Sequence, residues 1–188
     1  GDDSFVPMMA DCERGLGRPE RALELLRELR TSDPETKVEA AIVASGARSD
    51  MGQVDAALVA AVGGLEACDI IHPPQVVSTG LPFCVALLKD RATVERIKLN
   101  VAAMRTYAAS MGQAGINVME PFWVCLEGAT DAGDTFSRLL MAPPSPAEDP
   151  FTGSATGCMA SYLWAHGLIG KPTFTAEQGH EMGRAGQA

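Results

Sequence analysis

Residues 148–157 read EDPFTGSATG, and this stretch is the starting point for interpreting the whole chain. It joins a proline-rich loop to an apolar helix expected over 157–166. Glycines let a backbone approach a ligand, and unpaired N–H groups at a helix start point toward it, so the stretch is typical of an anion-binding loop. Asp149 beside that loop could bind an ammonium group or move a proton. Alternatively, Asp149, Thr152 and Ser154 only cap the helix and tie the loop.

Composition and charge exclude several classes of function. The 188 residues carry a net charge of −9, which argues against nucleic acid or an anionic membrane as a partner. We see no signal peptide and no apolar run long enough to span a bilayer. Five cysteines at irregular spacing without a CxxC pair indicate reduced thiols in a cytoplasmic protein. The three histidines (72, 166 and 180) are far apart in sequence, so we predict no metal site and no cofactor.

Residues 1–62 are predicted to be an all-helical segment. Apolar residues recur at helical spacing over 10–30, and 37–62 reads as two further helices divided near residues 50–52. GLGRPERAL (15–23) aligns with DMGQVDAAL (50–58) at an offset of 35 residues, near the tetratricopeptide period. Two copies are fewer than a stable solenoid needs, so this segment would have to pack on something else. The alternative is an unrelated helical hairpin with an accidental repeat.

Residues 63–188 are predicted to form an α+β domain. Strands are expected at 75–78, 83–88, 116–127 and 135–143, with Pro121 making the third an edge or a broken strand. Asn100 is expected to cap a helix that runs from 101 to about 111. Few helices among many strands, with one long apolar helix placed late, indicate a sheet wrapped on a central helix.

Four motifs resemble the PhzF family of phenazine-biosynthesis-type isomerases. They are PQVVSTGLPF (74–83), EDPFTGSATGCMASYL (148–163), HGL (166–168) and EQGHEMGR (177–184). The resemblance implies a half of the diaminopimelate-epimerase-like fold, whose two domains enclose a pocket between them. It also implies a proton shift on a small cyclic amino or carboxylic acid. Asp149 would assist proton transfer or bind the substrate amine, and Thr152, Gly153 and Ser154 would hold the substrate carboxylate.

The resemblance covers only the second half of such an isomerase. Residues 1–62 do not resemble the family's first domain, so its proton-shuttling glutamate has no counterpart here. We therefore expect an incomplete isomerase for a small carboxylate or amino acid-like substrate. A second hypothesis is a non-catalytic helical-repeat scaffold fused to a degenerate PhzF-like module. A third is a homodimeric enzyme in which another acid, such as Glu148 or Glu181, serves as the missing group.

Overall fold

The computed structural model describes residues 3–113 and 120–188 and divides into two compact units, Gly1–Gln53 and Val54–Ala188. The sequence patterns had suggested a division between residues 62 and 63. In the structure the helix Ala56–Val62 packs against a later helix of the second unit, so it belongs there by its contacts. Each unit is described by itself.

The first unit is a set of three mutually packed helices. After a 3₁₀ turn, η1 (Asp3–Phe5), it contains α1 (Val6–Gly15), α2 (Pro19–Glu28) and α3 (Pro34–Asp50). Prolines open α2 and α3 where a missing N–H costs nothing, and the Asp33 carboxylate caps α3 by accepting the Thr36 N–H at 2.8 Å. The fully buried core residues are all alanines, Ala10, Ala22 and Ala47, which let the helices approach closely.

The 35-residue repeat has a structural counterpart in the turns but not in the packing. Gly17 and Gly52 occupy equivalent turns, and both have a positive φ, of 72° and 70°. The aligned alanines differ, however, because Ala22 is fully buried whereas Ala57 is exposed. The two copies therefore share the glycine turn but not the packing, and the tetratricopeptide interpretation is not confirmed.

The second unit is built on one mixed sheet. Its strands are β1 (Gln75–Ser78), β2 (Pro82–Leu87), β3 (Pro121–Cys125), β4 (Thr135–Leu140), β5 (Glu148–Asp149), β6 (Ala176–Gln178) and β7 (Gly186–Gln187). The strand order is β1-β2-β3-β4-β6-β7, and β5 pairs with β4 off this path. The β2–β3 and β4–β6 pairs are parallel, and the other pairs are antiparallel.

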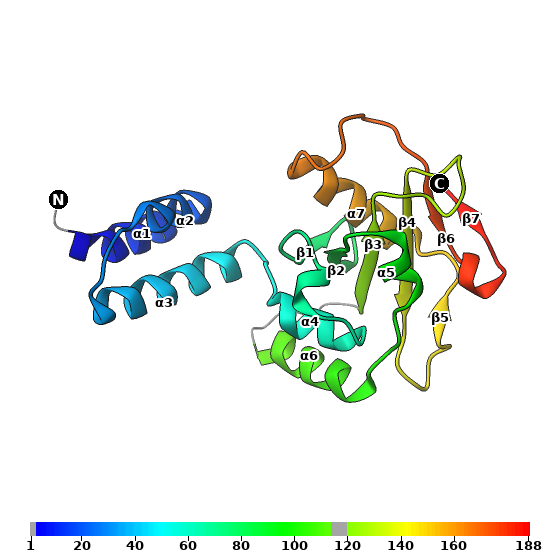
Figure 1. Ribbon diagram of the computed structural model, residues 1–188, viewed down its shortest axis with the longest axis horizontal. Helices are drawn as coiled ribbons and strands as arrows, with labels where there is room; N and C mark the ends of the chain where they lie inside the picture. The colour runs from blue at the N-terminus through cyan, green and yellow to red at the C-terminus, as the bar shows by residue number, and fades with distance from the viewer. Residues whose placement is uncertain (1–2, 114–119) are drawn as a thin grey trace. The chain divides into compact units, whose positions relative to one another are not determined.

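Helices cover both faces of this sheet (Figure 1). The apolar helix α7 (Gly153–Ala165) packs on one face, against Phe83, Val85, Leu87 and their neighbours. On the other face lie three helices, α4 (Ala56–Val62), α5 (Arg91–Glu95) and α6 (Val101–Gln113). The unit also contains two 3₁₀ turns, η2 (Ala67–Asp69) and η3 (His180–Met182). Alternate residues of each strand supply the two cores. The predicted α+β fold, with a sheet packed on a late apolar helix after a short helical segment, is confirmed.

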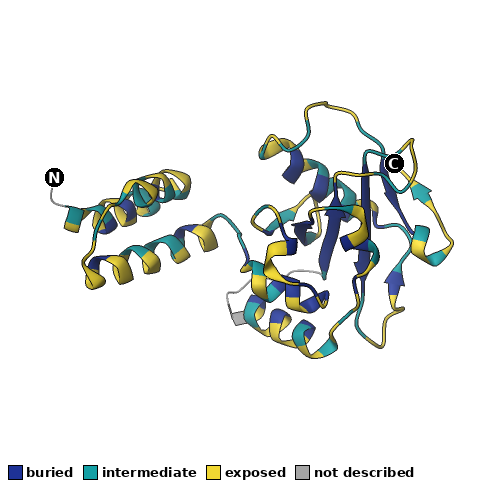
Figure 2. Ribbon diagram, viewed as in Figure 1, coloured by how far each residue is buried: buried dark blue, intermediate teal, exposed yellow. Residues whose placement is uncertain are grey.

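The central strands differ from one sequence expectation. β2, β3 and β4 are buried almost throughout (Figure 2), so β3 is neither an edge nor a broken strand. Pro121 is its first residue, a place where a sheet accepts proline, and the expected residues 116–119 lie outside the described part. Asn100 caps α6 as predicted, since its side-chain oxygen accepts the N–H groups of Ala102 and Ala103 at 3.1 Å. None of the helices in residues 3–113 and 120–188 has the length and hydrophobicity to cross a membrane.

Candidate functional site

The four predicted site residues meet at the N-terminal end of α7. Asp149 ends β5 and pairs with Leu139 of β4, whose side chain lies in the core under α7, so Asp149 is on the α7 face of the sheet. Thr152 is the buried residue that precedes α7, and Gly153 is the helix's first residue, exposed to solvent. Ser154 follows, half-buried. α7 starts four residues earlier than the sequence suggested, which places the whole TGSA segment at the helix start.

Hydrogen bonds fix Asp149 and Thr152 to each other. The Thr152 hydroxyl donates to Asp149 Oδ2 at 2.6 Å. The other carboxylate oxygen, Oδ1, accepts no hydrogen bond from the described residues. One oxygen of Asp149 is therefore held in place while the other remains available to a ligand.

The backbone N–H groups in the first turn of α7 are not capped by any described side chain. By helix geometry the amides of Gly153, Ser154 and Ala155 have no acceptor within the helix. No described side chain caps them, and the Thr152 hydroxyl bonds to Asp149 instead. The alternative had two parts. The side chains of Asp149, Thr152 and Ser154 do not cap the helix, so that part is wrong, whereas Asp149 and Thr152 do hold the loop together. Gly153 is exposed, and a Cβ added there would meet no atom within 4 Å, so the space beside the first residue of the helix is open; Ala155, by contrast, is buried.

A second motif from the sequence lies beside the same helix start. Thr79, in the turn between β1 and β2, donates from its hydroxyl to the Ser154 carbonyl at 3.4 Å. A side chain at Gly157 would come within 3.1 Å of that hydroxyl, so glycine allows the turn to approach α7. Cys158 is buried and donates to the Leu81 carbonyl at 3.4 Å. It is a core residue rather than an exposed thiol.

Glu148, although adjacent to Asp149, serves a different purpose. It pairs with Leu140 and so faces the opposite side of the sheet. There its carboxylate receives two hydrogen bonds from Arg138, from Nε at 2.9 Å and from Nη2 at 2.7 Å. Both side chains are about nine-tenths buried, 10% and 8% exposed. This buried ion pair was not predicted from the sequence, and it gives Glu148 a structural role. Glu181, the other acid considered, is exposed in η3.

The first two residues of the EQGHEMGR motif, Glu177 and Gln178, divide their roles in a similar way. Glu177 is fully buried and ties the turn before β4 to the last strand, because it accepts hydrogen bonds from the Thr130 hydroxyl and amide and from Gln187. Burial raises the pKa of Glu177, yet these hydrogen bonds outweigh it and hold the pKa below its ordinary value. Gln178 faces the other way and binds the loop at Asp149 and Thr152. The motif was noticed in the sequence, but nothing local signals the contact of Gln178 with the site.

The structure also brings together two histidines that are far apart in sequence. The rings of His72 and His166 lie 4.6 Å apart between centroids, near the C-terminal end of α7. His72 Nδ1 lies 2.6 Å from the Tyr162 hydroxyl oxygen, and that hydroxyl donates to the Pro73 carbonyl at 3.0 Å. Burial and the nearby His166 lower the pKa of His72. Within the described ranges, however, no three His, Cys, Asp or Glu side chains are placed to hold a metal ion.

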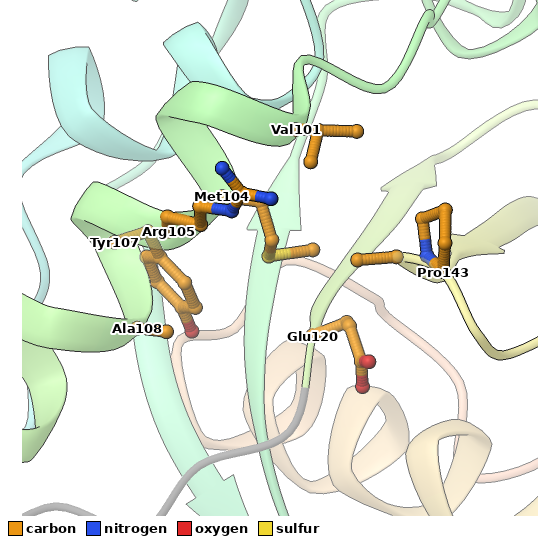
Figure 3. Close-up of a pocket in the computed structure, with 8 residues that line it drawn as sticks. Val101, Met104, Arg105, Tyr107, Ala108, Glu120 and Pro143 are labelled. Atoms are coloured by element: carbon orange, nitrogen blue, oxygen red, sulfur yellow. The ribbon is translucent and has the colours of Figure 1, made fainter.

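A cavity of about 460 Å³ lies on the α6 face of the sheet (Figure 3). The predicted site residues Asp149, Thr152, Gly153 and Ser154 do not line it, and Asp149 is on the opposite face. Most of the lining is apolar, with one charged residue from α6 and one just before β3. The lining residues are Val101, Met104, Arg105, Tyr107, Ala108, Glu120, Ala142 and Pro143.

Fold and site together define an α+β domain in which a carboxylate and free amides meet at the start of a buried helix. Residues 28–188 match the family of phenazine biosynthesis-like proteins, PhzC–PhzF, and the chain belongs to this family. The match includes α3 of the first unit as well as the whole second unit.

Relatives support the same assignment. The chain is 33% identical over 138 residues to an uncharacterized isomerase, YddE, of Salmonella typhimurium, a match covering 72% of this chain and 43% of YddE. The crystal structure of a PhzF-family phenazine biosynthesis protein from Bacillus anthracis shares the fold with a TM-score of 0.59 at 23% identity, over 73% of this chain and 46% of that one. A predicted epimerase from Pseudomonas aeruginosa gives 0.54 at 27% identity, over 72% and 45%. The chain thus spans less than half the length of these relatives.

Proposed function

We propose that the second unit is the substrate-holding half of a PhzF-type isomerase that shifts a proton on a small cyclic amino or carboxylic acid. Membership of the family, and the descriptions of relatives as an isomerase and a predicted epimerase, support this class of reaction. In this proposal Asp149 binds the substrate amine or exchanges its proton. The amides of Gly153 and Ser154, with the Ser154 hydroxyl, bind the substrate carboxylate.

The observation that carries the proposal is the pairing of one held carboxylate with an uncapped helix start. The Thr152 hydroxyl fixes Asp149 Oδ2 at 2.6 Å, which leaves Oδ1 for an ammonium or a transferable proton. The first amides of α7 carry the positive end of the helix dipole and favour an anion. A ligand with a carboxylate and an amine on one small ring could satisfy both groups at once. Each charge-assisted hydrogen bond of this kind contributes about 1.5–3 kcal/mol.

We propose further that catalysis needs a second half. Moving a proton between two carbons requires a group that removes it and a group that returns it, and Glu148 is occupied by Arg138. The relatives are more than twice as long as their matched regions, which leaves room in them for a second domain. Such a domain, or a second copy of this chain, would supply the missing acid or base and close the site against water.

The binding half of this proposal can be tested with the chain as it is. Titration with 3-hydroxyanthranilate, a ring that carries a carboxylate beside an amine, should show saturable binding by calorimetry. Asp149→Asn should weaken that binding at least about tenfold, the equivalent of one charged hydrogen bond. Asp131→Asn removes the same charge at an exposed position and should leave the affinity unchanged.

Catalysis is tested separately by solvent deuterium uptake into candidate cyclic substrates, followed by mass spectrometry. Uptake that Asp149→Asn abolishes would support the role of Asp149. If Asp149→Asn binds the ligand as strongly as the wild type does, the proposed site is excluded. If the chain alone binds the ligand without deuterium uptake, and uptake begins when a first-domain fragment of a relative is added, the need for a second half is supported.

A further inference from the structure

The side chain of Gln178 makes three hydrogen bonds to the loop that carries Asp149 and Thr152. Its oxygen accepts the Thr152 backbone N–H at 3.0 Å. Its nitrogen donates to the Asp149 carbonyl at 2.8 Å and to the Thr152 hydroxyl oxygen at 3.2 Å. Gln178 is only 1% exposed, so water does not compete for these bonds.

The partners of this amide determine its orientation. The Thr152 backbone N–H can only donate, so the atom facing it must be the Gln178 oxygen. The Asp149 carbonyl can only accept, so the atom facing it must be the Gln178 nitrogen. A flipped amide would place two donors against each other and two acceptors against each other, which a buried site does not tolerate.

This orientation fixes the direction of the next hydrogen bond. The Thr152 hydroxyl has a single hydrogen, and its oxygen already accepts from Gln178. Its hydrogen is therefore directed to Asp149 Oδ2 at 2.6 Å. The chain of donors runs from Gln178 through Thr152 to the carboxylate, and it stabilises the arrangement in which Asp149 is an acceptor.

The backbone around Gln178 is shaped to hold it against the loop. Gln178 pairs with Ser137 in the parallel β4–β6 register, which places it on the Asp149 side of the sheet. The next residue, Gly179, has a φ of +83°, and a Cβ there would lie 2.5 Å from the Pro150 carbonyl oxygen. Only glycine lets the end of β6 approach the loop this closely.

We propose that Gln178 is a positioning residue of the site: it orients the Thr152 hydroxyl toward Asp149 and so prepares the carboxylate for its ligand without touching that ligand. This inference rests on the proposed function for its consequence, which is ligand affinity. The hydrogen-bond relay itself is a property of the free protein and can be measured without a ligand.

The test uses Gln178→Met, which keeps the length of the side chain but none of its hydrogen bonds, and Thr152→Val, which removes only the hydroxyl. Gln187→Met is the matched control, because Gln187 belongs to the adjacent strand and bonds to Glu177 rather than to the loop. The side-chain carboxyl carbon of Asp149 is followed by NMR at fixed pH. Its resonance should move in both test variants and stay in place in the control.

Affinity for 3-hydroxyanthranilate then shows whether the relay matters for binding. Gln178→Met and Thr152→Val should each weaken it about tenfold, and the double variant should be no worse than either, because both changes break one relay. Additive losses, or an Asp149 resonance that ignores Gln178→Met, would overturn the inference. If Gln178→Met does not fold, Gln178→Asn takes its place: it keeps the amide, but the shorter side chain no longer reaches the Thr152 hydroxyl, so the resonance should again move.

The two proposals fail in different ways. If Asp149→Asn abolishes binding while the folded Gln178 variants bind normally, the site stands and the positioning role is wrong. If the Asp149 resonance responds to the relay but the wild type binds no ligand, the positioning role stands and the proposed function is wrong.

Discussion

Neutralising Glu148 should destabilise the second unit by about 3 kcal/mol. The Arg138 side chain is 10% exposed, and its guanidinium donates two hydrogen bonds to Glu148 and two more to the carbonyls of Val94 and Glu95. Removing one partner of a buried pair costs about 3–5 kcal/mol, because the remaining charge is left uncompensated. Glu148→Gln keeps one acceptor oxygen for the guanidinium, so we expect the lower end of that range.

Urea unfolding followed by tryptophan fluorescence measures this cost. The chain has two tryptophans, Trp123 and Trp164, and both lie in the second unit, so the signal reports that unit alone. Asp131→Asn is the matched control: it loses the same charge at an exposed position and should change the unfolding free energy by less than about 0.5 kcal/mol. Replacing both members of the pair, Arg138→Met with Glu148→Leu, should recover most of the loss, because it leaves no buried charge.

A cost below about 1 kcal/mol for Glu148→Gln would refute this reasoning, since that is the range of a solvated surface pair. It would mean that water reaches the guanidinium despite its burial.

Three further predictions concern stability. Burial, and then His166, lower the pKa of His72, so the unfolded state binds a proton at His72 more tightly than the folded state does. The second unit should therefore lose stability as the pH falls below about 6.5, the ordinary pKa of histidine. His72→Asn should flatten this pH dependence in thermal unfolding, and an unchanged slope would contradict the role of His72. Gly179→Ala should lower the unfolding free energy by at least about 2 kcal/mol, because φ is +83° and the new Cβ would meet two backbone carbonyls. Gly153→Ala is the control and should change the unfolding free energy little, because its Cβ would lie in open space. Similar urea midpoints for the two variants would contradict this expectation. Tyr162→Phe should cost about 1–2 kcal/mol by leaving the Pro73 carbonyl and the His72 ring nitrogen without their partner, a loss that a fluorescence melt would detect.

Local signals in the sequence were sufficient for many elements. The apolar runs of β2 and α7 and the cap at Asn100 each depend on residues within a few positions of one another, and the structure contains all of them. The position of Asp149 just before a helix start was readable for the same reason. The central place of β3 was not readable, because Pro121 disfavours a strand interior but is accepted as its first residue.

The sequence by itself determined that Asp149, Thr152, Gly153 and Ser154 would lie together, because a strand, a short loop and a helix start bring neighbours in the chain into contact. Only the tertiary structure decided what surrounds them. Gln178 reaches the loop from 29 residues away because β6 pairs in parallel with β4, and a parallel register leaves no local signature. The same holds for Arg138 with Glu148, whose burial depends on helices packing over that face of the sheet. Hydrogen bonds and ion pairs of this kind are set by how the layers stack, which no short segment of the chain encodes.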